Sequence, residues 1–400
     1  MDSKTDIVLA APVRTPIGKF GGGLASLSAA DLGTAAAAGA LSRAHLDPSK
    51  IDQVIFGHAR QAGGGPNTAR QIAFRAGVPV DRPAYTINQA CGSGLQAVLS
   101  AARTIRTGEA RVVLVGGAES MSNTPYLLPR ARWGYRLGHA EIVDGMYKDG
   151  FNDPLSGLVM GETAEELALE VGIDRAAADA WALGSQQRCE RARGAGRFTS
   201  EIVPVTVGGK KGEVVVDTDE HPRDGTTLAS LQKLAPVFRE GGTVTAGNAS
   251  GITDGAAALI VASREAAAEL GLPVVARLVD WQVVGVDPRI MGIGPVPAVE
   301  QLLARSGIQG RQIDDVELNE AFASQVLACL KRLPDLDPER VNQDGGAIAL
   351  GHPIGATGAR ILVTLLHGLA ARGGQRGLAT LCVSGGMGLA ALVEMEREAA

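Results

Sequence analysis

Two short stretches, IDQVIF at residues 51–56 and IDDVEL at residues 313–318, share a pattern and lie 262 positions apart. The same order of features follows each of them: a glycine-rich turn, an apolar segment with helical spacing, and an apolar strand that ends in glycines. The two glycine-rich turns contain Cys91 and His352, which are 261 positions apart. A separation that stays nearly constant over several features indicates that one structural unit has been duplicated.

Each copy alternates between segments typical of strands and segments typical of helices. The first copy opens with DIVLA (6–10) and continues with LGTAAAAGALSRAH (32–45), and the second opens with VARLVDW (275–281) and continues with AVEQLLARSG (298–307). Such alternation is typical of α/β proteins in which helices cover the sheets. We therefore predict two similar α/β halves, with covered mixed sheets, packed about a pseudo-twofold axis.

A segment of different composition separates the two halves. Residues 120–244 combine turn-rich, charged stretches with one amphipathic helical stretch from Thr163 to Arg193. Insertions at the carboxyl ends of strands are where α/β proteins commonly bind ligands. We predict a first half at 1–119, completed by about 245–270, an inserted loop domain at 120–244, and a second half at 271–400.

The composition argues against several classes of protein. The chain has 400 residues, of which 45% are hydrophobic, and a net charge of −5 without a dense basic run, so a nucleic-acid surface is not expected. The four cysteines form no CxxC pair, so neither a disulfide framework nor a metal site is expected. The N-terminal apolar run is too short for a signal peptide, and no stretch is expected to span a membrane. We expect a soluble cytoplasmic protein.

Cys91 lies in TINQACGSGLQAV (86–98), where an extended run meets a helical pattern. Backbone N–H groups and the dipole at a helix start stabilise a thiolate, so we expect an exposed cysteine with a lowered pKa. A nucleophile also needs a base. His352 occupies the corresponding turn of the second half, and a pseudo-twofold axis would bring the two turns together. A Cys–His pair is a common way to activate a thiol.

Two further residues are candidates for the same site. Cys382, in TLCVSGGMG, is either a core thiol or a second titratable group at the end of an apolar strand. Asn319 follows the strand of residues 313–318, where its amide could hold a water molecule or polarise a carbonyl.

Four motifs, NQACGSGL, NEAFA, GHPIGATGAR and CVSGGMG, resemble those of the thiolases in content, order and spacing, and the likeness covers essentially the whole chain. The resemblance implies a duplicated thiolase fold and an acyltransferase of the acetyl-CoA acetyltransferase type. Such an enzyme reversibly condenses two acetyl-CoA molecules, or an acyl-CoA and acetyl-CoA, to 3-ketoacyl-CoA and coenzyme A. It works through an acyl-cysteine by ping-pong chemistry, with coenzyme A and acetyl-CoA as substrates and no permanently bound cofactor.

The resemblance also implies a role for each catalytic residue. Cys91 would carry the acyl group and His352 would deprotonate it. Cys382 would move the proton on and off the α-carbon of acetyl-CoA. Asn319, through a water molecule, would line one oxyanion site together with His352, and the backbone N–H groups of Cys91 and Ser384 would form a second.

Other positions match substrate-binding positions of the family. Ser250 and Arg223 would contact the pantetheine arm and the nucleotide end of coenzyme A, which assigns coenzyme A binding to the insertion. Phe238 and Phe322 would form apolar walls, and Met160 would shape the acyl pocket.

The chain departs from the family pattern at two positions. Ser384 stands where the family usually has Gly, and a positive φ there would strain a serine. Val159 stands where several short-chain biosynthetic thiolases have His, which leaves the length and branching of the acyl chain open.

The resemblance further implies a homo-oligomer, either a dimer or a homotetramer, with a role in fatty acid metabolism. YLLPRARWGYRLGH (126–139) is a candidate assembly loop. Taken without the resemblance, its basic cluster at 128–136 is either a solvated loop or a contact for an anionic ligand or a neighbouring subunit.

Three alternatives stay open at the level of sequence. A decarboxylating ketoacyl synthase would have a histidine at the position of Asn319 and would not need Cys382 as a base. A cysteine hydrolase has no use for Cys382 or for a coenzyme A-binding insertion. A non-catalytic acyl-CoA carrier would be expected to lack catalytic residues. The sequence leaves the physiological direction, condensation or thiolysis, undetermined.

Overall fold

The computed structural model describes residues 6–209 and 212–396, and its core is one continuous ten-stranded sheet. The strands of the first half are β1 (Ile7–Arg14), β2 (Gly18–Lys19), β3 (Gln53–Gly57), β4 (Ala84–Ile87), β5 (Val112–Ser120) and β10 (Thr253–Ser263). Those of the second half are β11 (Val274–Gly285), β12 (Asp315–Leu318), β13 (Arg376–Val383) and β14 (Met387–Met395). The strand order is β12-β13-β14-β11-β1-β10-β5-β3-β4, and β2 pairs with β10.

The two halves repeat one strand order outward from the β1–β11 pair, in which Val8 lies opposite Arg277. The first half continues with β10, β5 and β3, and the second with β14, β13 and β12. The β3–β5 and β12–β13 pairs are parallel, whereas the pairs nearer the junction are antiparallel. Residues 51–56 and 313–318 contribute to the equivalent strands β3 and β12. The predicted duplicated α/β fold with mixed sheets is confirmed.

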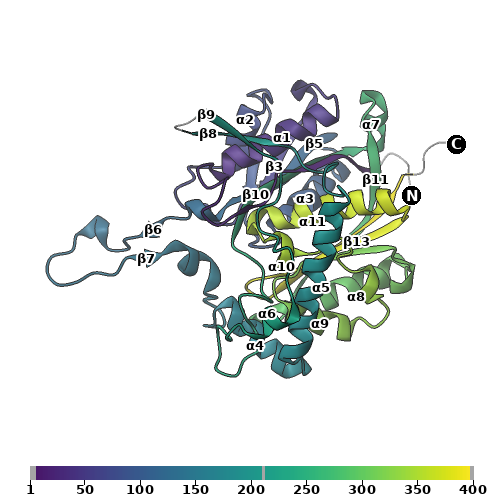
Figure 1. Cartoon of the computed structure of the whole chain (residues 1–400). Helices are drawn as coiled ribbons and strands as arrows, with labels where there is room; N and C mark the ends of the chain where they lie inside the picture. The colour runs from purple at the N-terminus through teal and green to yellow at the C-terminus, as the bar shows by residue number, and fades with distance from the viewer. Residues whose placement is uncertain (1–5, 210–211, 397–400) are drawn as a thin grey trace.

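Helices form three layers around the two halves of the sheet (Figure 1). The helices of the main fold are α1 (Ala29–Arg43), α2 (Thr68–Arg75), α3 (Ser93–Arg106), α7 (Arg264–Leu270), α8 (Pro295–Ser306), α9 (Ala323–Arg332), α10 (Ala347–Leu350) and α11 (Ile354–Arg372). α1 and α2 share a core with the outer face of the first half, and α8 and α9 share one with the outer face of the second. α3 and α11 lie between the halves and contact both. Strands covered on both faces explain the long apolar runs of the sequence.

The central helix α11 corrects one expectation. Its length and apolar composition would suffice to cross a membrane, although no stretch was expected to qualify. However, 83% of its apolar window is buried inside the protein. α11 packs against α3, β5, β10 and β13, so it meets protein on several sides. A helix that is apolar around its whole circumference is expected in such a position.

The insertion between β5 and β10 has its own small elements. They are β6 (Tyr126–Leu127), β7 (Val143–Asp144), β8 (Val205–Gly209), β9 (Gly212–Val216), α4 (Met160–Val171), α5 (Arg175–Gly194) and α6 (Leu228–Gln232). The single helical stretch predicted at 163–193 is wrong, because two helices occupy it. Gly172 ends α4 with a φ of 71°, and the Asp174 side chain accepts a hydrogen bond from the Ala177 N–H to start α5. The domain boundaries proposed at residues 119, 244 and 270 stay a prediction.

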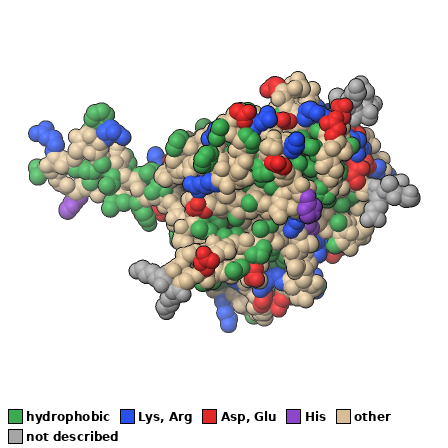
Figure 2. All heavy atoms as spheres, turned by 90° about the horizontal axis from the view of Figure 1, so that it is seen from above, with side chains coloured by type: hydrophobic (Ala, Val, Ile, Leu, Met, Phe, Trp, Pro, Cys, Tyr) green, Lys and Arg blue, Asp and Glu red, His purple; other side chains and the backbone are tan. Residues whose placement is uncertain are grey.

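The segment from β6 to β7, residues 126–144, forms an arm that projects from the body (Figure 1). Figure 2 shows hydrophobic and basic side chains gathered on it. Its exposed apolar side chains are Tyr126, Leu128, Trp133, Tyr135, Leu137 and Ile142. Trp133 is 85% exposed and Leu137 is 100% exposed. Contiguous exposed apolar surface of this kind marks a site of contact with another surface.

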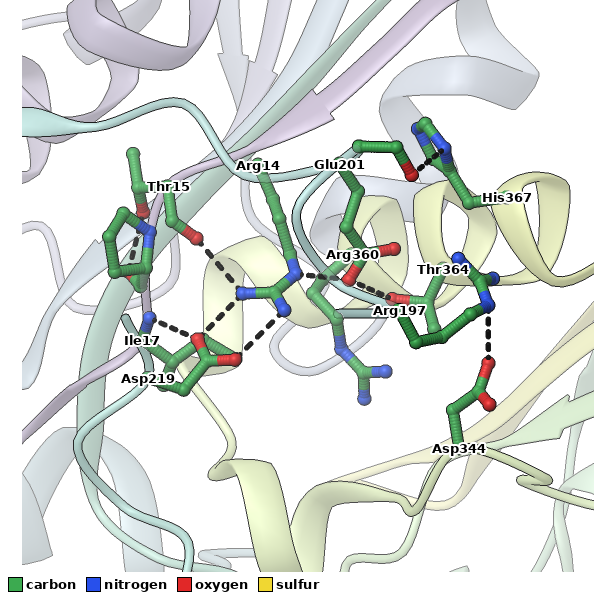
Figure 3. A network of polar contacts seen from close by, with 12 residues as sticks. Arg14, Thr15, Ile17, Arg197, Glu201, Asp219, Asp344, Arg360, Thr364 and His367 are labelled. Carbon is green, nitrogen blue, oxygen red and sulfur yellow. Dashed lines mark hydrogen bonds and ion pairs between the residues drawn. The ribbon is translucent and has the colours of Figure 1, made fainter. Parts of the chain in front are cut away.

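A buried ionic network links β1 to the insertion (Figure 3). Arg14 is fully buried and donates to both carboxylate oxygens of Asp219, at 2.7 and 2.9 Å, and to Glu201 Oε1 at 2.6 Å. Asp219 also accepts the N–H of Ile17 at 2.8 Å. Thr364 of α11 donates to Glu201 at 3.4 Å. The network therefore joins three parts of the molecule around one guanidinium.

Candidate functional site

One cavity of about 220 Å³ is lined by residues of both halves and of the insertion. The expected site residues that line it are Cys91, Met160, Phe238, Ser250, Phe322, His352, Cys382 and Ser384. The repeated turns of the two halves therefore do meet at a common centre. Asn319 and Arg223 do not line this cavity.

Cys91 lies in a tight turn between β4 and α3. The preceding residue, Ala90, has a φ of 43°, and its N–H donates to Asn88 Oδ1 at 3.0 Å. A left-handed conformation costs a non-glycine residue roughly 1–2 kcal/mol, and such strain concentrates at functional sites. A Cβ on Gly94 would lie 2.6 Å from the backbone nitrogen of Ala359, so this glycine lets α3 approach α11. The turn thus holds the thiol beside the second half.

The expectation of an exposed Cys91 with a lowered pKa is wrong. Cys91 is half-buried, and burial raises the pKa of its thiol. The charge of Arg60 and hydrogen bonds from the backbone N–H groups of Ser384 and Cys91 act in the opposite direction, but their effect is smaller. α3 begins only at Ser93, two residues after the thiol. Cys91 therefore needs a neighbouring base to form a thiolate.

His352 is buried, and its two ring nitrogens differ in their surroundings. Nδ1 lies 2.6 Å from Thr357 Oγ1, which donates its one hydrogen to the Pro353 carbonyl at 3.0 Å. Thr357 therefore accepts from His352, and Nδ1 carries the ring proton. Nε2 has no hydrogen-bond partner within residues 6–209 and 212–396. Burial, followed by the charges of Arg360 and Arg60, lowers the pKa of His352 to about 3. The ring is therefore neutral, and its Nε2 lone pair is available to a proton, but the low pKa means that the ring holds a transferred proton only briefly.

Thr357 is expected to act as a positioning residue for this base. Thr357→Val removes the acceptor at Nδ1 and should slow alkylation of Cys91 by iodoacetamide about 10- to 100-fold, because the ring loses its orientation and its fixed tautomer. Thr357→Ser should restore most of the rate, and the profile of alkylation against pH should shift only in the valine variant. Thr364→Val, about two turns further along α11, is the matched control. Equal alkylation by Thr357→Val and wild type would contradict this role.

Cys382 and Ser384 stand at the end of β13. Cys382 is buried, and burial, then the neighbouring thiols Cys91 and Cys329, raise its pKa well above the ordinary value. Ser384 does not have a positive φ, because Gly385 and Gly386 take that conformation, at 83° and 82°. The serine in place of the family's glycine is therefore not strained, and its N–H reaches the sulfur of Cys91.

Asn319 and Arg223 lie outside the cavity lining. The amide of Asn319 is buried, and neither its Oδ1 nor its Nδ2 has a partner in the described part of the chain. Buried polar atoms require a hydrogen-bond partner, so the expected contact through a water molecule stays a prediction. Arg223 is held through its backbone N–H, which donates to Gln186 Oε1 at 3.0 Å.

Glu119 was not identified from the sequence, although a carboxylate at the end of an apolar strand was a visible signal. It is fully buried and accepts the N–H groups of Ala59 at 3.2 Å and of Gly355 at 2.9 Å. His58 Nε2 lies 3.1 Å from its other oxygen. Because Gly355 follows the turn of His352, Glu119 fixes that turn against the loop after β3. Arg60, in the same loop, lines the cavity and was also missed.

Comparison with known proteins agrees with this geometry. Models of the thiolase N-terminal and C-terminal domains match residues 7–265 and 272–395. The chain is 50% identical over 386 residues to the acetyl-CoA acetyltransferase of Pseudomonas aeruginosa, and this match covers 96% of this chain and 98% of the Pseudomonas protein. The crystal structure of the Bacillus anthracis acetyl-CoA acetyltransferase is 46% identical with a TM-score of 0.95, over 98% of this chain and 99% of that one. The human mitochondrial 3-ketoacyl-CoA thiolase in complex with CoA is 43% identical with a TM-score of 0.93, over 98% of each chain. The chain belongs to the thiolase family.

Proposed function

We propose that the protein is an acyl-CoA:acetyl-CoA C-acyltransferase that reversibly condenses thioesters of coenzyme A through an acyl group on Cys91. One observation carries the proposal: Cys91, the free Nε2 of His352, and Cys382 share one cavity. A thiol with a neighbouring base suffices for acyl transfer. A second thiol adds a base that can remove a proton from the α-carbon of acetyl-CoA.

In the first half-reaction, His352 Nε2 takes the proton of Cys91. The thiolate attacks the thioester carbonyl, the bond from carbon to the coenzyme A sulfur breaks, and the departing thiolate takes the proton from His352. This proton transfer is required because burial raises the pKa of Cys91. The products are acyl-Cys91 and free coenzyme A.

In the second half-reaction, the Cys382 thiolate removes a proton from the α-carbon of acetyl-CoA. The enolate attacks the acyl carbonyl, a carbon–carbon bond forms, and the bond to the Cys91 sulfur breaks. The departing Cys91 thiolate takes up the proton that Cys382 removed, which restores the Cys91 thiol and the Cys382 thiolate. Since burial raises the pKa of Cys382, its thiolate is a stronger base than an ordinary one. In this proposal, Asn319 through a water molecule and the N–H groups of Cys91 and Ser384 stabilise the oxyanions, and His352 donates to an oxyanion only while its Nε2 holds a transferred proton.

The remaining expectations extend the proposal. Ser250 and Arg223 bind coenzyme A, and Met160, Phe238 and Phe322 enclose the acyl chain. The protein acts in the cytoplasm, in fatty acid metabolism, as a homo-oligomer. The exposed apolar side chains of the 126–144 arm support assembly into a homotetramer.

The proposal is tested with acetoacetyl-CoA and free coenzyme A. The protein should remove the enolate absorbance and form two acetyl-CoA molecules for each acetoacetyl-CoA consumed. A cysteine hydrolase would instead release a free acid without consuming coenzyme A, and a carrier would bind the thioester unchanged. Either of these results would overturn the proposal.

His352→Ala should slow acylation of Cys91 and condensation alike. The variant loses the base and the oxyanion donor that Nε2 becomes once it holds a proton. Loss of a single oxyanion donor alone costs about 10²–10³ in rate. Rapid-quench mass spectrometry of acetyl-Cys91 measures the first step, and acetoacetyl-CoA formation measures both. Near-normal acylation in this variant would show that another group activates the thiol.

A further inference from the structure

Arg60 places a cation at the cavity that contains the nucleophile. It lies in the loop after β3, is only 8% exposed, and lines the cavity together with Cys91. Its backbone N–H donates to Glu119 at 3.2 Å, which fixes the start of the side chain. A Cβ built on Gly150 would overlap the guanidinium, so the insertion packs directly against it through a glycine. The guanidinium is therefore held in place from two sides.

The guanidinium of Arg60 makes no direct contact with a carboxylate of the described residues, although Glu119 accepts the backbone N–H of the same residue. Within residues 6–209 and 212–396, its guanidinium makes one hydrogen bond, from Nη1 to the Asp149 carbonyl at 3.0 Å, and its buried Nε has no partner. Among the residues that the structure describes, no carboxylate lies within 4.0 Å of this guanidinium. The fully buried Arg14 and Arg360 each pair with a carboxylate, at 2.6 and 3.0 Å. A buried cation without a directly paired carboxylate is costly. Apart from the N–H bonded to Asp149, the donors of this guanidinium have no partner among the described residues and are available to a ligand.

The identity of that ligand follows from the position of Arg60. Most of the other lining residues are apolar, including Met121, Phe151 and Ile354, so they offer little to an anion. The phosphates of coenzyme A are separated from its sulfur by the whole pantetheine arm. An anionic group that the substrate brings near the reacting sulfur of Cys91 is therefore part of the acyl group. Arginine binds carboxylates with good geometry and strength.

We propose that Arg60 binds a carboxylate at the far end of the acyl chain, and that the acyl substrate of Cys91 is the coenzyme A thioester of a dicarboxylic acid. This inference rests on the proposed function and names its substrate class. Arg60 then determines specificity, while Cys91, His352 and Cys382 carry out the chemistry. The charge on the acyl group offsets the buried guanidinium only when the correct substrate is bound.

The first test uses the wild-type protein and two thioesters that have the same number of heavy atoms in the acyl group. Succinyl-CoA ends in a carboxylate, whereas 4-methylpentanoyl-CoA ends in an isopropyl group of the same shape. Acylation of Cys91 by each is followed by rapid-quench mass spectrometry, and the ratio of the two values of kcat/KM is determined. The proposal requires a ratio well above one. A ratio of one or below would overturn it.

The second test measures the same ratio in variants. Arg60→Leu should lower the ratio about 10- to 100-fold, the range expected for loss of a hydrogen bond to a charged group. Arg60→Lys keeps the charge and should retain part of the preference. Arg311→Leu removes an exposed charge outside the cavity and should leave the ratio unchanged.

The outcomes separate this inference from the proposed function. If Arg60→Leu slows both thioesters by the same factor, Arg60 acts on the Cys91 thiolate and not on the acyl group, and the inference is wrong. If the wild type cleaves acetoacetyl-CoA but has no preference for succinyl-CoA, the inference fails while the proposed function stands. If no thioester acylates Cys91, the proposed function itself fails.

Discussion

Cys382→Ala is expected to leave acetylation of Cys91 intact but to slow carbon–carbon bond formation about 10²–10⁴-fold, the usual contribution of a positioned acid–base group. Acyl transfer between coenzyme A thiols needs a nucleophile and its base, and it involves no carbanion. Condensation also requires removal of an α-proton. The two thiols therefore belong to different steps although they share one cavity.

Two exchange experiments separate these steps. Cys382→Ala should still exchange acetyl groups between acetyl-CoA and labelled coenzyme A, but it should no longer exchange the methyl protons of acetyl-CoA with deuterated solvent. Cys91→Ala should fail in acetyl exchange altogether. Cys189→Ala is the matched control, because its thiol is also buried but lies outside the cavity and is not a neighbour of Cys382. Deuterium exchange at the wild-type rate in Cys382→Ala would assign the carbon base to another residue.

Arg14→Leu is expected to lower the free energy of unfolding by about 3–5 kcal/mol, the cost of breaking a buried ion pair from one side. Asp219 and Glu201 would each keep a negative charge in the interior without their partner. The substitution also removes the link between β1 and the insertion. Denaturant titration followed by circular dichroism measures the loss.

Two comparisons make this result specific. Arg75→Leu breaks the surface pair with Asp31, whose side chains are 42% and 44% exposed, and should cost about 0–1 kcal/mol. A triple variant that replaces Arg14, Asp219 and Glu201 with apolar residues of similar size should lose less than Arg14→Leu alone, because no charge is left unpaired. A loss in Arg14→Leu no larger than that in Arg75→Leu would contradict the assigned role of the network.

The duplicated fold was predictable because equivalent segments of the two halves lie a nearly constant number of residues apart, which the sequence alone shows. The separation between residues 51–56 and 313–318 is repeated in the turns and helices that follow them. The turns of Cys91 and His352 are therefore equivalent, and equivalent turns of two packed halves come together. The pairing of β1 with β11 was not predictable, because edge-to-edge joining of two sheets leaves no periodic trace. The break between α4 and α5 was not predictable either, because Gly172 lies within a continuous amphipathic pattern.

The site was predictable in its residues but less so in its electrostatics. The motif around Cys91 predicts that the residue lies just before a helix. The pKa of its thiol also depends on burial by residues distant in sequence, and burial raises this pKa more than the nearby charge and N–H groups lower it. Asn319 was correctly placed after a strand, whereas the exclusion of its side chain from the cavity lining follows from tertiary packing. Arg60 and Glu119 belong to no long motif, and only the folded chain shows that both adjoin the catalytic turns.

The position of β10 has a consequence for how the chain folds during synthesis. In the sheet, β1 lies between β10 and β11, so both of its partners come from the other side of the long insertion. A ribosome adding about 5–20 residues per second needs roughly 12–50 s to go from β1 to β10. Throughout that interval, β1 is an apolar strand with two open edges, which is a template for aggregation. The nascent chain is therefore expected to depend on chaperones until β11 has left the ribosome. Its yield should fall when translation is slowed between residues 14 and 253.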